Sequence, residues 1–120
     1  MIDIKKVMSE LTLEEKAGLC SGQTFWLTKA IERLGVPAVM MTDGPHGLRK
    51  EVQKSGGTNI MKGSEPSTCF PTAVTTASSW DRGLLFGVGK AIGEEAIDQG
   101  VSTVLGPGTN IKRSPLCGRN

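Results

Sequence analysis

The chain has 120 residues, with 14 basic and 12 acidic side chains and a formal net charge of +2. This length accommodates one small domain. The near-balance of charge argues against nucleic acid and against a membrane surface as partners. No run approaches the ~20 apolar residues of a membrane span. The N-terminus lacks the basic segment and apolar core of a signal peptide. We therefore expect a cytoplasmic protein.

The cysteines and the single histidine do not indicate a cross-linked or metal-bound framework. Cys20, Cys69 and Cys117 are widely spaced and include no C-x-x-C pair. Such spacing and an odd count favour free thiols over disulfides. His46 is the only histidine, so we expect no zinc site, and no cofactor is predicted.

Two short helices are predicted at the N-terminus. Residues 1–10 form an amphipathic stretch with Asp3 as a candidate N-cap. Thr12 and Glu15 then match a capping box that opens the next helix. Further along, a short helical stretch over residues 29–34 is expected to end at Gly35.

Residues 36–50 organise the rest of the chain. The apolar run 38–41, bounded by turn signals, predicts a buried strand. Asp43 follows at the carboxyl end of that strand, which is where parallel α/β folds bind their ligands. Trp26, upstream, is expected to pack in the core, although an indole that stacks on a sugar is the alternative.

The second half predicts a loop, a helix and another strand. Polar, glycine-rich residues 51–68 indicate a solvated surface connection, with a rim over the site as the alternative. Residues 73–79 fit either a strand or a helical turn. A helix should begin at residue 80 or 81 and run to about Gln99, with an apolar stripe. Gly100 should stop it, before a buried strand at residues 101–105. This order is typical of a parallel α/β sheet.

A glycine-rich stretch inside the predicted helix suggests a phosphate-binding loop at first. It reads Gly-Val-Gly-Lys over residues 87–90. The third glycine of the dinucleotide motif would fall at position 92, which is Ile92, and no strand leads into the stretch. We therefore do not predict a nucleotide site.

An ordered set of motifs resembles family 3 of the glycoside hydrolases, the β-glucosidase family. Residues 43–49, Asp-Gly-Pro-His-Gly-Leu-Arg, resemble a signature near the start of that family. Further similar segments lie at residues 11–16, 70–72, 80–81, 93–96, 106–108 and 113–120. The resemblance implies an α/β fold in which residues 1–120 are the N-terminal part of a (β/α)8 barrel domain, because a complete TIM-like barrel needs roughly 250 residues.

The resemblance also implies a sugar-binding site. Asp43 matches the family's aspartate that binds sugar hydroxyls, and a carboxylate accepts strong hydrogen bonds from such groups. The alternative is that Asp43 only caps a turn. Arg49 and Arg119 match arginines near the same sugar. Their alternatives are a solvated side chain or an ion pair to Asp43 for Arg49, and a tail residue for Arg119. Arg113 is expected to be structural.

The family's catalytic pair has no match in this chain. Retaining hydrolysis uses a nucleophile and an acid/base about 5–5.5 Å apart. The Ser-Asp-Trp-like nucleophile motif is missing, and Asp81 occurs in the reverse order, Trp-Asp. We therefore predict no catalytic residue here and no activity for the 120-residue chain alone. The implied whole protein is a β-glucosidase that acts on a small sugar substrate.

Two other functions are compatible with the same residues. The chain could be a non-catalytic carbohydrate-binding or partner module derived from part of a barrel. It could also be an unrelated small α/β domain with an anion site near residues 106–108. The sequence does not determine the sugar, the aglycone or the oligomeric state.

Overall fold

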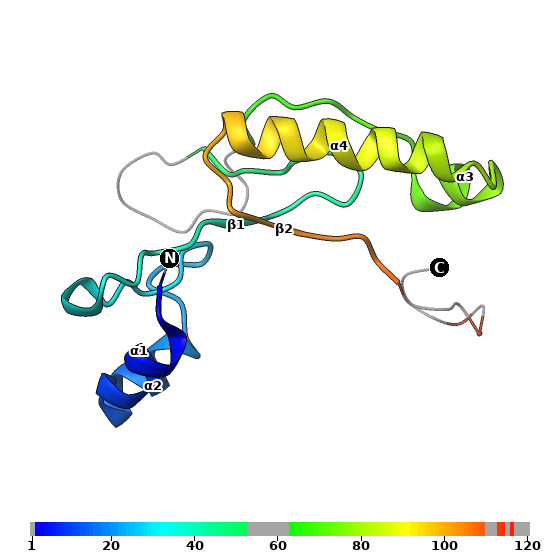
Figure 1. The fold of residues 1–120 in the computed structure, drawn as a ribbon. Helices are drawn as coiled ribbons and strands as arrows, with labels where there is room; N and C mark the ends of the chain where they lie inside the picture. The colour runs from blue at the N-terminus through cyan, green and yellow to red at the C-terminus, as the bar shows by residue number, and fades with distance from the viewer. Residues whose placement is uncertain (1, 53–62, 110–112, 115, 117–120) are drawn as a thin grey trace.

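The computed structural model describes residues 2–52, 63–109, 113, 114 and 116 of the chain. The elements, shown in Figure 1, are as follows in chain order: α1 (Ile4–Glu10), α2 (Leu13–Leu19), the 3₁₀ turn η1 (Glu32–Leu34), β1 (Met41–Asp43), α3 (Ala73–Ser78), α4 (Arg82–Asp98) and β2 (Thr103–Leu105). The predicted α/β class is therefore confirmed.

The two strands form a parallel pair at the centre of the molecule. Met41 pairs with Thr103, and Asp43 with Leu105. Both strands begin later than predicted, since the sequence placed them over residues 38–41 and 101–105. Before β1 the chain pairs instead with an earlier segment, because Thr28 N–H donates to Val39 O at 3.1 Å. Helix α4 crosses one face of the pair (Figure 1).

Helix α4 forms as its sequence predicts. The Asp81 carboxylate accepts from Leu84 N–H at 3.0 Å, as an N-cap should. Burial increases along the apolar stripe, from Leu85, which is 41% exposed, to Ala96, which is 6% exposed. Gly100 has φ +67° and ends the helix, so that the chain turns into β2.

Residues 73–78 form a helix, which decides between the two alternatives that the sequence left open. Trp80 separates α3 from α4 in a left-handed conformation, with φ +52°, and is 91% exposed. The two helices meet at an end of the molecule remote from α1 and α2 (Figure 1).

Helices α1 and α2, with η1, form what we call the N-terminal arm. Asp3 accepts from Lys6 N–H at 3.1 Å and so caps α1. Thr12 accepts from Glu15 N–H at 3.2 Å, and Thr12 N–H donates to the Glu15 carboxylate at 2.9 Å, which completes the predicted capping box. Helical structure over residues 29–34 is shorter than predicted and is limited to η1.

An ion pair holds the N-terminal arm together. Arg33 Nε donates to Glu15 Oε1 at 2.7 Å, and Arg33 Nη2 donates both to Glu15 Oε2 and, at 2.9 Å, to the carbonyl oxygen of Glu10. The hydrogen bond from Arg33, aided by the one from Thr12, lowers the pKa of the Glu15 carboxyl to about 2. The same pairing raises the pKa of Arg33.

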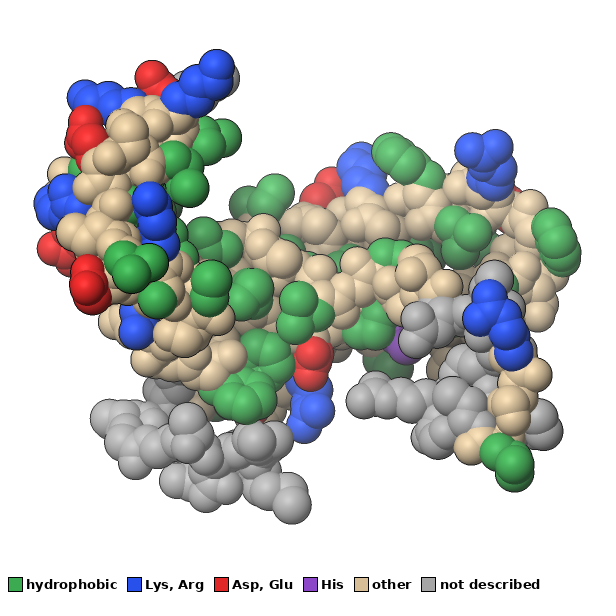
Figure 2. Space-filling model, turned by 90° about the horizontal axis from the view of Figure 1, so that it is seen from below, with side chains coloured by type: hydrophobic (Ala, Val, Ile, Leu, Met, Phe, Trp, Pro, Cys, Tyr) green, Lys and Arg blue, Asp and Glu red, His purple; other side chains and the backbone are tan. Residues whose placement is uncertain are grey.

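The main hydrophobic core is small. It consists of Met40, Leu48, Ala96 and Val101, with Trp26 among the half-buried side chains around it. Trp26 thus packs in the core, as expected. The accessible surface is 9331 Å², whereas a compact protein of this length would expose about 6,200 Å². Hydrophobic side chains are accordingly visible over much of the face in Figure 2.

Two further sequence expectations concern the cysteines and membrane spans. Cys20 and Cys69 are free, as predicted, and both are exposed, whereas Cys117 lies outside the described residues. Within the described part of the chain, no helix is long and apolar enough to cross a membrane.

Candidate functional site

Asp43 lies where the sequence predicts, at the carboxyl end of β1. It is half-buried and pairs with Leu105 of β2. Its carbonyl oxygen accepts from Arg49 N–H at 2.9 Å, which closes residues 43–49 into a loop that we call the site loop. No hydrogen bond or ion pair to the Asp43 carboxylate is formed by the residues that the structure describes. Capping of the turn is therefore not its role there.

The conformation of the site loop is fixed by a buried hydrogen bond and by a glycine. Thr42 is 0% exposed, and its hydroxyl donates to the carbonyl oxygen of Arg49 at 2.6 Å. Gly44 has φ +147°, and a Cβ at that position would lie 2.6 Å from the carbonyl oxygen of Gly47. Such contacts and such a backbone conformation require glycine. The loop geometry therefore follows from particular residues of the motif.

Of the two arginines predicted to contact the sugar, the structure describes Arg49 but not Arg119. Arg49 is exposed, and the bond that joins it to Asp43 is between backbone groups rather than between side chains. The Arg49 backbone therefore lies beside Asp43, and the two described side chains form no ion pair with each other. Arg119 lies outside the described residues, so its predicted sugar contact stays a prediction.

The loop that follows β2 packs on the site loop. A Cβ on Gly106 would lie 2.9 Å from the Cα of Pro45. The carboxyl ends of β1 and β2 therefore present two loops in direct contact, as expected for neighbouring parallel strands. Gly106, the first of the residues considered for an anion site, thus faces Pro45, and the anion site over residues 106–108 stays a hypothesis.

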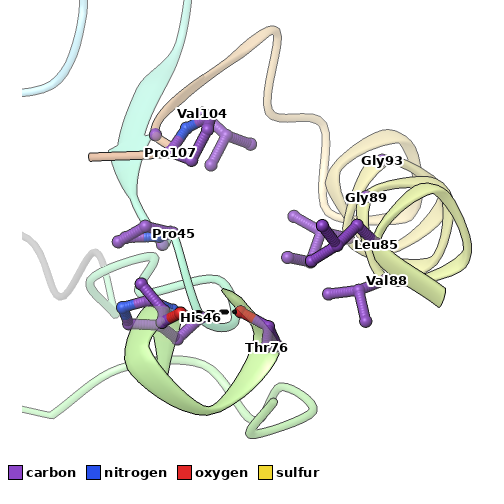
Figure 3. Close-up of a pocket in the computed structure, with 13 residues that line it drawn as sticks. Pro45, His46, Thr76, Leu85, Val88, Gly89, Gly93, Val104 and Pro107 are labelled. Carbon is purple, nitrogen blue, oxygen red and sulfur yellow. Dashed lines mark hydrogen bonds between the residues drawn. The ribbon is translucent and has the colours of Figure 1, made fainter. Parts of the chain in front are cut away.

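A cavity of about 530 Å³ lies between these loops and the helices. Figure 3 shows Pro45 and His46 on one side of it, Val104 and Pro107 at the strand end, and Leu85 and Val88 on the α4 side. The lining is almost entirely apolar, and Asp43 does not contribute to it. Sugar hydroxyls need polar partners, and the lining of this cavity offers few of them.

Residues 65–70, which we call the bracing segment, form an irregular and mostly exposed stretch, which agrees with the surface connection predicted for residues 51–68, but they also hydrogen-bond to their neighbours. Glu65 N–H donates to Lys50 O at 2.8 Å, the Ser67 hydroxyl to Leu48 O at 2.6 Å, and Phe70 N–H to His46 O at 2.8 Å. The segment thus runs along the site loop. The remaining loop residues 53–62 lie outside the described residues.

Helix α4 holds the bracing segment from the other side. Thr68 N–H donates to Glu95 Oε1 at 3.0 Å, and the Thr68 hydroxyl donates to the same oxygen. Gln99 Nε2 donates to Pro66 O at 3.0 Å. Lys50 Nζ donates to Gln99 O at 2.5 Å. This carbonyl lies at the C-terminus of α4, where the helix dipole stabilises a positive charge. Sequence reasoning noted Glu95 in a motif but gave it no role.

The other singled-out residues have ordinary positions. Residues 87–90 lie inside α4 and form no phosphate loop, and Lys90 pairs with Glu94 at 3.7 Å. Asp81 serves as the helix cap, which agrees with leaving it out of the catalytic pair. His46 lines the apolar cavity.

Comparison with known proteins gives consistent matches. No family model matches the chain. It is 60% identical over 119 residues to thermostable beta-glucosidase B of Acetivibrio thermocellus, a match covering 99% of the chain and 16% of that relative. It is 50% identical over 112 residues to an exo-alpha-(1->6)-L-arabinopyranosidase of Bifidobacterium longum, covering 93% of the chain and 15% of that relative.

Solved structures agree with these relatives. A beta-glucosidase from Kluyveromyces marxianus, in complex with glucose, superposes with a TM-score of 0.84 at 44% identity, covering 99% of this chain and 14% of that one. A GH3 beta-glucosidase from Bifidobacterium adolescentis gives 0.74 at 47% identity, covering 93% and 15%.

The four proteins named above are glycosidases by name. The resemblance to glycoside hydrolase family 3 is thereby confirmed, and the chain corresponds to the N-terminal portion of these proteins. It spans only about one-sixth of the length of the curated relatives.

Proposed function

We propose that this chain supplies part of the sugar-binding subsite of a retaining β-glucosidase that removes terminal β-D-glucosyl residues. In this proposal its two strands and their helices are the first β/α units of a (β/α)8 barrel domain. Asp43 accepts hydrogen bonds from sugar hydroxyls, and Arg49 and Arg119 donate to the same sugar. The nucleophile and the acid/base are assigned to no residue of these 120.

The observation that carries the proposal is the position of the Asp43 carboxylate. It stands at the carboxyl end of a parallel strand, which is the ligand-binding end in barrels. It is half-buried, and its backbone is fixed on both sides, by β2 and by Arg49. A fixed carboxylate that accepts from two hydroxyls can strengthen those bonds as charge develops on the sugar ring.

The site also explains why the chain alone should not turn over substrate. Groups that position a sugar supply neither a nucleophile nor a proton, so they bind without accelerating bond cleavage. The exposed apolar side chains of α4, such as Phe86 and Ile97, need further packing partners. In the proposal, the remainder of the barrel covers them.

A chimera tests the proposal. In it, these 120 residues replace the matching segment of the Acetivibrio thermocellus relative. Hydrolysis of an aryl β-glucoside is measured for the chimera and its variants. We expect Asp43→Ala to lower kcat/KM by about two orders of magnitude or more. Asp98→Ala, a matched change of an exposed aspartate at the far end of α4, should leave kcat/KM unchanged.

Two outcomes would contradict the proposal. One is an Asp43→Ala chimera with unaltered kcat/KM. The other is turnover of the aryl glucoside by the purified 120-residue chain. Glucose binding by that chain without hydrolysis, seen by calorimetry, would favour the non-catalytic carbohydrate-binding module instead.

A further inference from the structure

We infer that Glu95 of α4 is a positioning residue for the sugar-binding carboxylate, acting through the bracing segment on the site loop. The inference rests on the proposed function of Asp43. It goes beyond that proposal because it assigns a role in the reaction to a helix residue whose hydrogen bonds are to the bracing segment rather than to the site loop.

The first link joins the helix to the bracing segment. One oxygen of the half-buried Glu95 carboxylate accepts from both the backbone N–H and the hydroxyl of Thr68, the former at 3.0 Å. The second oxygen lies 3.4 Å from the same N–H. Hydrogen bonds to an ionised acceptor are about twice as strong as neutral ones. Thr68 is therefore tied to α4 by hydrogen bonds to a carboxylate.

The second link joins the bracing segment to the site loop. A Cβ on Gly47 would lie 2.2 Å from the carbonyl oxygen of Thr68, so the two backbones are in close contact where Glu95 anchors the segment. Two residues later, Phe70 N–H donates to His46 O at 2.8 Å. One residue earlier, the Ser67 hydroxyl donates to Leu48 O at 2.6 Å. The middle of the site loop is thus held on both sides of Gly47.

The third link reaches the carboxylate. The site loop begins at Asp43 and returns to it through the bond from Arg49 N–H to Asp43 O. A shift of residues 46–48 therefore changes the frame that sets the direction of the Asp43 side chain. Misplacement of a binding group by about 1 Å is enough to cost a large factor in rate.

A mutant cycle in the chimera tests this role, with kcat/KM measured well below the unfolding temperature. Glu95→Ala should lower kcat/KM about ten-fold. Glu95→Gln keeps an oxygen that can accept from Thr68, and should restore activity to within about three-fold of the parent. Glu94→Ala is the matched control, because Glu94 is an exposed neighbour whose ion-pair partner is Lys90 on the same helix.

The decisive arm is the double variant. If Glu95 acts by placing Asp43, then Glu95→Ala should lower kcat/KM by less than about two-fold in a chimera that already carries Asp43→Ala. A residue that only stabilises the fold would give the same factor in both backgrounds. Thr68→Val, which removes the hydroxyl donor and keeps the N–H, replaces Glu95→Ala in the cycle if that variant does not fold.

Two results would overturn the positioning role. One is a double variant whose loss in kcat/KM equals the product of the losses of the two single variants. The other is a Glu95→Ala loss no larger than that of Glu94→Ala. In either case a large Asp43→Ala effect would leave the proposed function intact. An Asp43→Ala chimera with full activity would overturn both. Coupling between the two positions, with rescue by Glu95→Gln, is the expected result.

Discussion

The centre of the molecule and the N-terminal arm are stabilised in different ways. In the centre, β1 pairs with β2 some sixty residues later, and the bracing segment ties the site loop to α4. In the arm, helices α1 and α2 are capped by their own neighbours, and Arg33 is the link between them and η1. The candidate site therefore depends on the pairing of strands some sixty residues apart, whereas the Arg33 contacts of the arm join residues only 18 and 23 positions apart.

The largest expected effect tests the close contact in the centre and compares two glycines there. Gly47→Ala places a Cβ 2.2 Å from the carbonyl oxygen of Thr68 in a backbone with φ +130°, so it should destabilise the chimera by about 3 kcal/mol. Gly87→Ala is the control, because a Cβ there meets nothing within 4 Å inside α4, and it should stabilise by about 0.5–1 kcal/mol. Urea unfolding of both variants measures the difference.

The same two glycine variants should also differ in their rate of hydrolysis. Gly47 lies in the site loop, so the fraction of Gly47→Ala chimera that remains folded should hydrolyse aryl glucoside more slowly. Equal unfolding midpoints for the two glycine variants would show that the site loop and the bracing segment are not in the close contact described.

An intermediate effect compares two helix caps. Asp81→Ala and Asp3→Ala each remove a carboxylate that accepts a backbone N–H, at a cost of about 1 kcal/mol. We expect kcat/KM to fall only for Asp81→Ala, because α4 carries Glu95, whereas α1 lies in the N-terminal arm, at the other end of the molecule from α3 and the start of α4 (Figure 1). Steady-state kinetics on both chimeras measures this. A loss of kcat/KM with Asp3→Ala would mean that the arm communicates with the site.

The smallest effect concerns pH in the arm. The pKa of Glu15 is lowered from 4.5 to about 2, so its contribution to stability is complete above pH 4.5 and is lost as pH falls toward 2. An NMR titration of Glu15 should show this pKa, and Arg33→Gln should return it toward 4.5. Because Arg33 is partly exposed, added salt should weaken the shift. A Glu15 titration unchanged by Arg33→Gln would contradict the ion pair.

The sequence predicted what short-range chemistry determines. The caps at Asp3, Thr12 and Asp81 and the helix stops at Gly35 and Gly100 depend on residues within four positions, and each is found where expected. The position of Asp43 at a strand end follows from an apolar run and a turn.

The long-range features were beyond the sequence. The strands start later than the apolar runs because the register of β1 is set by β2, and residues 38–40 instead meet the segment around Trp26 and Leu27. The polar residues 65–68 resemble a solvated loop in composition. Only the fold shows that their donors and acceptors meet Glu95, Gln99 and the site loop.

The most direct test of the central claim is a crystal structure of the chimera with bound glucose. We predict that both oxygens of the Asp43 carboxylate lie within about 3 Å of sugar hydroxyls, as hydrogen bonds require, with Thr68 still bonded to Glu95 beneath the site loop. Glucose bound elsewhere, or a glucose whose hydroxyls are all beyond hydrogen-bonding distance of Asp43, would contradict the account.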